Sequence, residues 1–160
     1  MGLIDFVKDA GAKVFGGGDK AAASEAAKDE QLEELRKGNE LLRYVKGMGL
    51  PVDDLKITFD DGTATITGTV QSTAVRENIV IGVGNVHGVA RVDDRLTVDN
   101  PTPPARMYTV KSGDTLSKIA KEHYGDAMKY PTIFEANRPM LSDPDKIYPG
   151  QVLRIPAVDA

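Results

Sequence analysis

The chain has 160 residues, a formal net charge of −4 at pH 7 and no cysteine. Scattered basic residues in an acidic chain argue against nucleic-acid binding, and the lack of cysteine excludes disulfides, thiolate catalysis and cysteine-based zinc sites. No apolar run approaches the roughly 18 residues that span a bilayer, and the first residues lack the pattern of a secretory signal. We therefore expect a cytoplasmic protein without stable membrane insertion.

Residues 1–23 predict an N-terminal helix followed by a glycine- and alanine-rich linker. Apolar residues recur near helical spacing up to the triple glycine at 16–18, which ends the helix because glycine costs backbone entropy there. A helix this short needs a surface to dock on, so we expect it to cover a hydrophobic patch. Its apolar residues are Leu3, Ile4, Phe6, Val7, Ala10 and Val14.

Residues 24–98 predict an α+β module in the order helix, hairpin, helix and strand. The first helix is expected over residues 21–46, and Ser72 is the expected N-cap of the second. Alternating apolar residues on both sides of Asp61-Gly62 predict a hairpin, because this dipeptide favours a two-residue turn. The residues expected to face the core are Leu32, Leu35, Leu42 and Val45 in the first helix, Leu55, Ile57, Phe59, Ala64 and Ile66 in the hairpin, Ile79, Val80 and Val83 in the second helix, and Val92, Leu96 and Val98 in the strand.

Residues 99–106 predict an extended linker, because three prolines in this segment forbid a helix. The rest of the chain then predicts a strand, two helices and a closing strand. Ser112 or Asp114 can cap the first of these helices, which ends at Gly125. The second is expected around residues 132–137. The residues expected to point inward from the first are Leu116, Ile119 and Ala120.

The sequence offers no convincing catalytic set. His87 and His123 lie in different modules. Neighbouring aspartates in a strand point to opposite faces, so they cannot act as an acid–base pair. Asp60-Asp61 beside the hairpin glycine is explained by turn chemistry without a divalent ion. We expect no enzymatic activity.

A monovalent cation site leaves little side-chain signature, because backbone carbonyls can replace the water shell of potassium. Carbonyls that are not used in a ladder occur at helix ends and in glycine turns. Two segments qualify: residues 9–13, and residues 83–89, where Gly82, Gly84 and Gly88 permit sharp curvature. A plain helix-to-strand turn with glycine caps explains the second segment without any ion.

Several motifs resemble known domains. MYTVKSGDTLSKIA, from residue 107, and IYPGQVLRIP, from residue 147, closely resemble the opening and the close of LysM domains, while residues 55–98 look like a BON domain. With FVKDAG near the start and VGN-x-x-G-x-A-x-VDD in the middle, nearly the whole chain resembles the Kbp family of bacterial potassium-binding proteins, apart from an expansion at residues 16–28.

This resemblance implies an α+β fold of two small domains. The expected parts are an N-terminal helix and linker at residues 1–23, a BON-like αββαβ module at 24–98, a proline-rich linker at 99–106 and a LysM βααβ module at 107–157.

The same resemblance implies a cytoplasmic potassium sensor or buffer that closes around the ion and serves in a stress response. We expect a monomer that binds potassium, with rubidium or caesium as substitutes. Only main-chain oxygens would hold the ion, so the side chains at Ala12, Val86 and Val89 would be free to vary. Carried onto the matching motifs, the carbonyl donors are those of Val7, Ala10, Ala12, Gly84, Val86 and Val89.

A glycan-binding function is the main alternative, because LysM domains commonly hold N-acetylglucosamine polymers between two loops. The same loop residues can instead set turns and bury the core of a small domain. We favour potassium over peptidoglycan because the chain lacks an export signal. The glycan-groove residues are Gly113, Asp114, Thr115, Leu116, Ile147 and Tyr148.

Membrane or protein association through the first helix and the BON-like module is a third interpretation. The helix is a poor anionic-lipid binder, because Asp5 and Asp9 stand beside Lys8 and Lys13 on its polar face.

Overall fold

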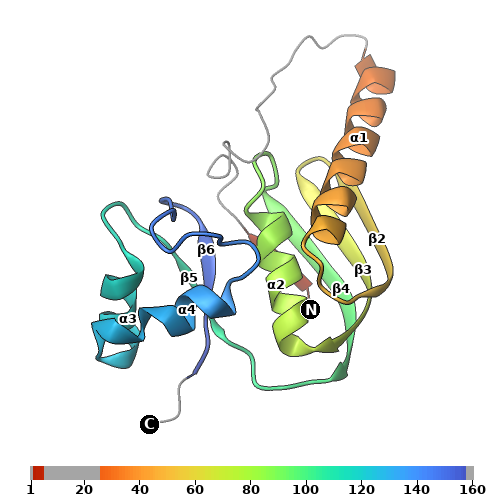
Figure 1. Cartoon of the computed structure of the whole chain (residues 1–160). Coiled ribbons are helices and arrows are strands. Elements are labelled where there is room, and N and C mark those ends of the chain that lie inside the picture. The colour runs from red at the N-terminus through yellow and green to blue at the C-terminus, as the bar shows by residue number, and fades with distance from the viewer. Residues whose placement is uncertain (1, 6–25, 158–160) are drawn as a thin grey trace.

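The computed structural model in Figure 1 describes residues 2–5 and 26–157, and it contains a four-stranded sheet of order β1-β4-β3-β2 and a two-stranded sheet of β5 and β6. This mixture of helices and strands in two small units confirms the predicted α+β class. In chain order the elements are β1 (Gly2–Asp5), α1 (Ala26–Gly47), β2 (Asp53–Asp60), β3 (Thr63–Ser72), α2 (Thr73–Gly84), β4 (Arg91–Asn100), β5 (Arg106–Thr109), α3 (Leu116–Tyr124), the 3-10 helix η1 (Ala127–Lys129), α4 (Tyr130–Ala136) and β6 (Val152–Ile155).

The predicted hairpin supplies the edge strand β2 and the interior strand β3 of the larger sheet. Asp61 and Gly62 have φ values of 52° and 83°, and a type I′ turn requires positive φ at both central residues. Strand β3 then runs parallel to β4, with α2 as the crossover between them. Ser72 caps α2 as predicted, since its side chain accepts a hydrogen bond from the Val75 amide.

The prediction that the chain begins with a helix is wrong for residues 2–5. These residues form β1, which pairs antiparallel with β4 so that Gly2 lies opposite Asp94 and Asp5 opposite Arg91. A short apolar run does not distinguish a strand from a helix, and pairing with the free edge of β4 satisfies backbone groups that a marginal helix would satisfy less well. The rest of the predicted helix and its linker, residues 6–25, lie outside the described residues.

Helices α1 and α2 cover one face of the four-stranded sheet (Figure 1). The predicted inner face of α1 is correct at Val45, which is fully buried beside Leu41, but wrong at Leu32 and Leu35, which are 50% and 65% exposed. Figure 1 shows that the start of α1 projects past the end of the sheet, and Glu34 bonds the Asp61 amide in the hairpin turn. The hairpin, α2 and β4 bury the predicted residues Ile57, Ala64, Ile66, Ile79, Val80, Val83, Val92 and Leu96.

The second unit packs α3 and α4 against β5 and β6 around a separate core that includes Leu116, Ile119 and Leu153. The prediction that Ser112 or Asp114 caps α3 is wrong. The cap is Thr115, whose side-chain oxygen accepts a hydrogen bond from the Lys118 amide. Asp114 instead accepts hydrogen bonds from Tyr108 and from the Lys111 amide, which hold the preceding loop. Gly125, with φ of 77°, ends α3 as predicted.

Candidate functional site

The turn from α2 into β4 is the part of the predicted site that lies within the described residues. Helix α2 ends at Gly84, and the Asn85 amide bonds back to the Ile81 carbonyl at 3.0 Å. The Val89 amide then donates to the Val86 carbonyl at 3.1 Å, while Gly88 between them has φ of 95°. Residues 86–89 thus form a tight turn whose third residue needs glycine.

Core packing and the neighbouring hairpin hold this turn in place. The side chains of Val86 and Val89 are 1% and 0% exposed, so the prediction that they are free to vary is wrong. The Ala90 amide donates to the Gly62 carbonyl at 2.8 Å, which ties the turn to the β2–β3 hairpin. Gly82 does not shape the turn: it lies inside α2, where an added Cβ would meet the Met48 methyl group at 2.9 Å. The carbonyls of the turn are therefore held by a rigid frame.

Some of these carbonyls have no hydrogen-bond donor among the described residues. No hydrogen-bond donor within residues 2–5 and 26–157 reaches the carbonyl oxygens of Gly84 or Val89. The Val86 carbonyl accepts one hydrogen bond and keeps its second lone pair. Unpaired carbonyls are normal at a helix C-terminus, where they carry the negative end of the helix dipole. The arrangement therefore suits a cation held without formal negative charge.

Strand β1 ends close to the same turn. It ends at Asp5 opposite Arg91, and Arg91 is two residues beyond Val89 along the chain. Val7, Ala10 and Ala12, the other predicted carbonyl donors, follow directly but lie outside the described residues. Strand β1 thus places Asp5 beside the first residues of β4, which directly follow the turn.

Lys37 is a residue at the turn that the sequence did not indicate. It extends from α1, and its ammonium donates a 2.7 Å hydrogen bond to the His87 carbonyl. Burial lowers the pKa of Lys37, and the nearby Glu40 carboxylate opposes that effect. A lysine in the polar stretch of a helix resembles any solvated surface residue, so no local pattern could have found it.

The turn is also joined to the LysM-like unit through the side chain of Asn85. Its amide nitrogen donates to the Val152 carbonyl and its oxygen accepts from the Val152 amide, both at 2.9 Å. Tyr148 adds a 3.3 Å hydrogen bond to the Asn85 carbonyl. Asn85 lies between two of the predicted carbonyl donors, so the backbone that would face an ion is bound directly to strand β6.

Asn137 repeats this arrangement one step along β6. Its amide nitrogen donates to the Arg154 carbonyl at 2.9 Å, and its oxygen accepts from the Arg154 amide at 2.7 Å. Strand β5 pairs with the other edge of β6. The two asparagines therefore satisfy the free edge of β6 as a third strand would, one from each unit of the protein.

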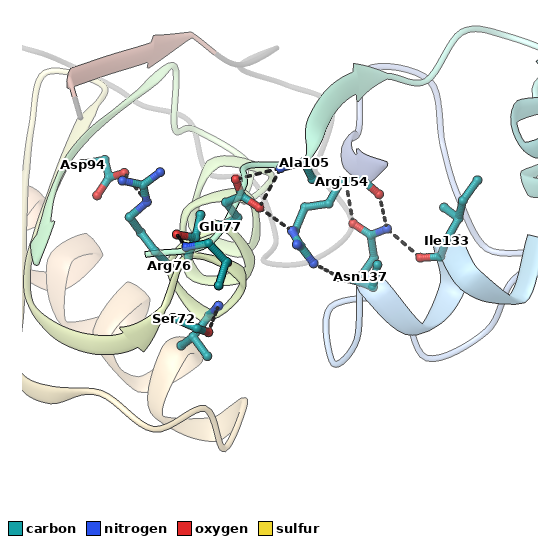
Figure 2. Close-up of polar contacts among 12 residues, drawn as sticks. Ser72, Arg76, Glu77, Asp94, Ala105, Ile133, Asn137 and Arg154 are labelled. Carbon is teal, nitrogen blue, oxygen red and sulfur yellow. Dashed lines mark hydrogen bonds and ion pairs between the residues drawn. The ribbon is translucent and has the colours of Figure 1, made fainter. Parts of the chain in front are cut away.

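A buried ion pair forms the second link between the two units (Figure 2). Glu77, on α2, and Arg154, on β6, are only 3% and 7% exposed, and Arg154 Nε lies 2.9 Å from the Glu77 carboxylate. The Ala105 amide of the linker also donates to Glu77, and Arg154 donates to the Ala136 carbonyl at 2.7 Å. Both charges are paired and hydrogen-bonded, which is the condition for charges to be buried at acceptable cost.

The glycan-groove residues are engaged within the protein. Leu116 is 2% exposed in the core, and Thr115 is used as a helix cap. Gly113, with φ of 88°, sets the loop, and Ile147 packs on the core of the LysM-like unit. Tyr148 faces Asn85 across the contact between the units. These contacts favour the structural role of the loops over a sugar-binding one.

The loop aspartate Asp114 should give this region a measurable pH dependence. The Tyr108 hydroxyl donates a 2.6 Å hydrogen bond to Asp114 and lowers the pKa of its carboxyl group, and the Lys111 amide acts in the same direction. The same bond raises the pKa of Tyr108 to about 12. Because folding lowers the Asp114 pKa, its stabilisation is present above the unfolded-state value of about 3.9 and is lost as the pH falls through the folded-state value.

We therefore expect the free energy of unfolding of Asp114→Asn to fall less steeply than that of the wild type as the pH decreases below about 4. Urea denaturation followed by circular dichroism at a series of acidic pH values measures it. The matched control is Asp126→Asn, which alters a similar exposed aspartate that accepts one backbone amide but lacks the tyrosine bond. An unchanged acid dependence in the Asp114 variant would contradict this role.

Within the described residues, no group of three or more His, Asp or Glu side chains gathers as a metal site. No helix in that part of the chain is both long enough and apolar enough to cross a bilayer.

Comparison with known proteins matches residues 40–100 to the BON domain and residues 108–156 to the LysM domain. The potassium binding protein Kbp of Escherichia coli is 46% identical over 157 residues, which cover 98% of this chain and 99% of that protein. An uncharacterized protein of Deinococcus radiodurans is 34% identical over 145 residues, 82% of this chain and 56% of its own length. An esterase of Mycobacterium tuberculosis is 45% identical over 67 residues, or 42% of this chain.

These matches differ in what they cover. The esterase match spans 13% of that enzyme, so it transfers no activity to this chain. The Kbp match runs through both domains almost from end to end and confirms the resemblance seen in the motifs. The chain belongs to the family of the Escherichia coli potassium binding protein Kbp, and it carries a BON domain followed by a LysM domain.

Proposed function

We propose that this protein binds a potassium ion through backbone carbonyls at the turn between α2 and β4. The observation that carries the proposal is the 46% identity, over nearly the whole chain, to a relative named for potassium binding. The proposed donors are the carbonyls of Gly84, Val86 and Val89 together with those of Val7, Ala10 and Ala12. Potassium is the first choice of ion, and rubidium or caesium would substitute for it.

The described geometry supports this proposal. The turn carries carbonyls that no described donor occupies, and core packing of Val86 and Val89 restricts their movement. A set of neutral carbonyls suits a large monovalent ion, whereas magnesium and calcium prefer carboxylate oxygens. The pairing of Asp5 with Arg91 brings the chain before Val7 to the turn. Covalent geometry then keeps Val7 within about 7 Å of Asp5.

Binding would close the N-terminal segment onto the turn. An ion that bridges the two segments binds the closed state preferentially, so it shifts the population toward that state. Because the population of the closed state would depend on the potassium concentration, the protein could act as a cytoplasmic sensor or buffer of the ion. A role in a stress response, where ion concentration changes, follows from the same switch. We propose a monomer without enzymatic activity.

In this proposal the LysM domain supports the ion site instead of binding glycan. Glu77, inside α2, and Asn85, at its C-terminus, both bond to β6, so the docked LysM domain fixes the direction in which the end of α2 presents its carbonyls. Tyr148, which would otherwise be a candidate for stacking on a sugar, is part of this contact.

Thermal unfolding in potassium, sodium and caesium chlorides of equal concentration tests the function. At a potassium concentration 100 times the dissociation constant, we expect stabilisation of about 2.7 kcal/mol and a rise in Tm of about 5–10 °C relative to sodium. Amide exchange of residues 1–16 should slow in potassium. Equal melting temperatures in all three salts would exclude the proposed function.

A substitution that alters the backbone of the turn tests whether the turn is the potassium site. Gly88→Ala is expected to weaken potassium binding about tenfold or more, because alanine resists the positive φ that the turn requires. The control is Gly113→Ala, which strains a loop glycine of similar φ, 88° against 95°, in the LysM domain. Calorimetric titration that shows equal effects for both variants would mean that the turn is not the site.

A further inference from the structure

Lys37 brings a positive charge to the candidate ion-binding turn. Its ammonium lies 2.7 Å from the His87 carbonyl oxygen, and a Cβ on Gly88 would be 3.4 Å from its nitrogen. His87 and Gly88 are the two middle residues of the turn, between the proposed donors Val86 and Val89. A four-residue turn spans less than about 7 Å between its end Cα atoms. The charge of Lys37 is therefore close to any ion that these carbonyls hold.

Such a charge acts differently on monovalent and divalent ions. Coulomb repulsion is proportional to the charge of the bound ion, so a divalent ion is repelled twice as strongly as a monovalent one at the same place. The attraction of carbonyl dipoles is also larger for a divalent ion, and size alone does not exclude barium, which has nearly the radius of potassium. A nearby positive charge counters the stronger attraction of the carbonyls for a divalent ion and leaves the carbonyls themselves unchanged.

We propose that Lys37 is a charge filter, which raises the preference of the turn for monovalent over divalent cations. The inference rests on the proposed function, because it assigns specificity to the same site. The half-buried position of Lys37 and its bond to a turn carbonyl keep the charge against the site. Burial lowers the pKa of Lys37, and Glu40, on the same helix, opposes that effect.

The test compares potassium and barium binding by the full chain carrying Lys37→Met, which keeps the length of the side chain and removes its charge. Calorimetry measures the potassium affinity, and competition with potassium measures the barium affinity, at constant ionic strength set by tetramethylammonium chloride. With partial screening by salt, we expect the potassium affinity to rise about threefold and the barium affinity about tenfold, because the factor for a divalent ion is the square of that for a monovalent ion.

Two control variants separate charge from structure. Lys37→Arg keeps the charge and should leave the barium-to-potassium affinity ratio within about twofold of the wild type. Lys46→Met removes an exposed lysine from the same helix about 13 Å farther along, and it should leave both affinities unchanged.

The affinity ratio decides the outcome. A purely structural effect of Lys37→Met would change both affinities by a similar factor, and an unchanged ratio, including barium competition that stays undetectable, would overturn the charge filter. Wild-type protein that binds no potassium would overturn the proposed function itself, and the two failures are thus distinguishable.

Discussion

Replacing Glu77 by alanine is expected to lower the free energy of unfolding by about 3–5 kcal/mol. The substitution leaves the guanidinium of Arg154, a residue that is 7% exposed, without its 2.9 Å carboxylate partner. It also removes the acceptor of the Ala105 amide, so the linker keeps only the bond from the Thr102 amide to Thr73 among its described hydrogen bonds to α2. Urea denaturation followed by far-ultraviolet circular dichroism measures the loss. Amide exchange of β6 and α2 shows whether the two domains have separated.

Two variants control for the Glu77 result. Glu33→Ala breaks the exposed pair with Arg36, whose side chains are more than half exposed, and should cost less than about 0.5 kcal/mol. The double variant Glu77→Leu with Arg154→Met replaces both charges by apolar groups and should recover at least half of the loss, because neither charge is then buried alone. A loss below about 1 kcal/mol for Glu77→Ala would contradict the proposed importance of this pair.

Replacing Asn85 by alanine is expected to weaken potassium binding at least tenfold and to cost about 2–4 kcal/mol of stability. The side chain satisfies both the amide and the carbonyl of Val152 at 2.9 Å, and alanine leaves these groups without partners in a buried contact. Since Asn85 lies between Gly84 and Val86, loosening it from β6 should also loosen the carbonyls proposed for the ion. Calorimetric titration with potassium chloride and urea denaturation measure the two effects separately.

Asn137→Ala is the matched control, because Asn137 makes the same pair of bonds to Arg154 one step along β6. It should destabilise the protein by a similar amount but change potassium affinity by less than about twofold at a temperature where both variants are folded. Equal losses of affinity in the two variants would mean that general destabilisation, and not the contact at the turn, is responsible.

The local structure of this protein followed from local physics. Asp61-Gly62 predicted a hairpin because few residues tolerate two successive positive φ values, and Ser72 predicted a helix start because its oxygen can bond a free amide. The alternation around Ile57 and Ile66 located the core strands. Each of these signals lies within a few neighbouring residues, so the printed sequence contains it in full.

The predictions from the sequence were wrong where the local sequence suited more than one structure equally well. Gly2–Asp5 is short enough to suit either a strand or a helix, and the free edge of β4 decided for a strand. Asp114 and Thr115 are both good caps, and the bond from Tyr108 assigns Asp114 to the loop instead. Leu32 and Leu35 follow the helical period but are exposed. In each case the surroundings in the folded chain decide between alternatives that the local sequence leaves equal.

The sequence by itself determined the two domains, their order, the hairpin and the glycine turn, because hydrophobic period, caps and motifs are local. Only the tertiary structure revealed the contacts that Lys37, Asn85 and Glu77 make. Their partners are 50, 67 and 77 residues away along the chain. A polar side chain has no period and does not encode its distant partner, so the meeting of α1, the turn and β6 becomes visible only when packing brings them together.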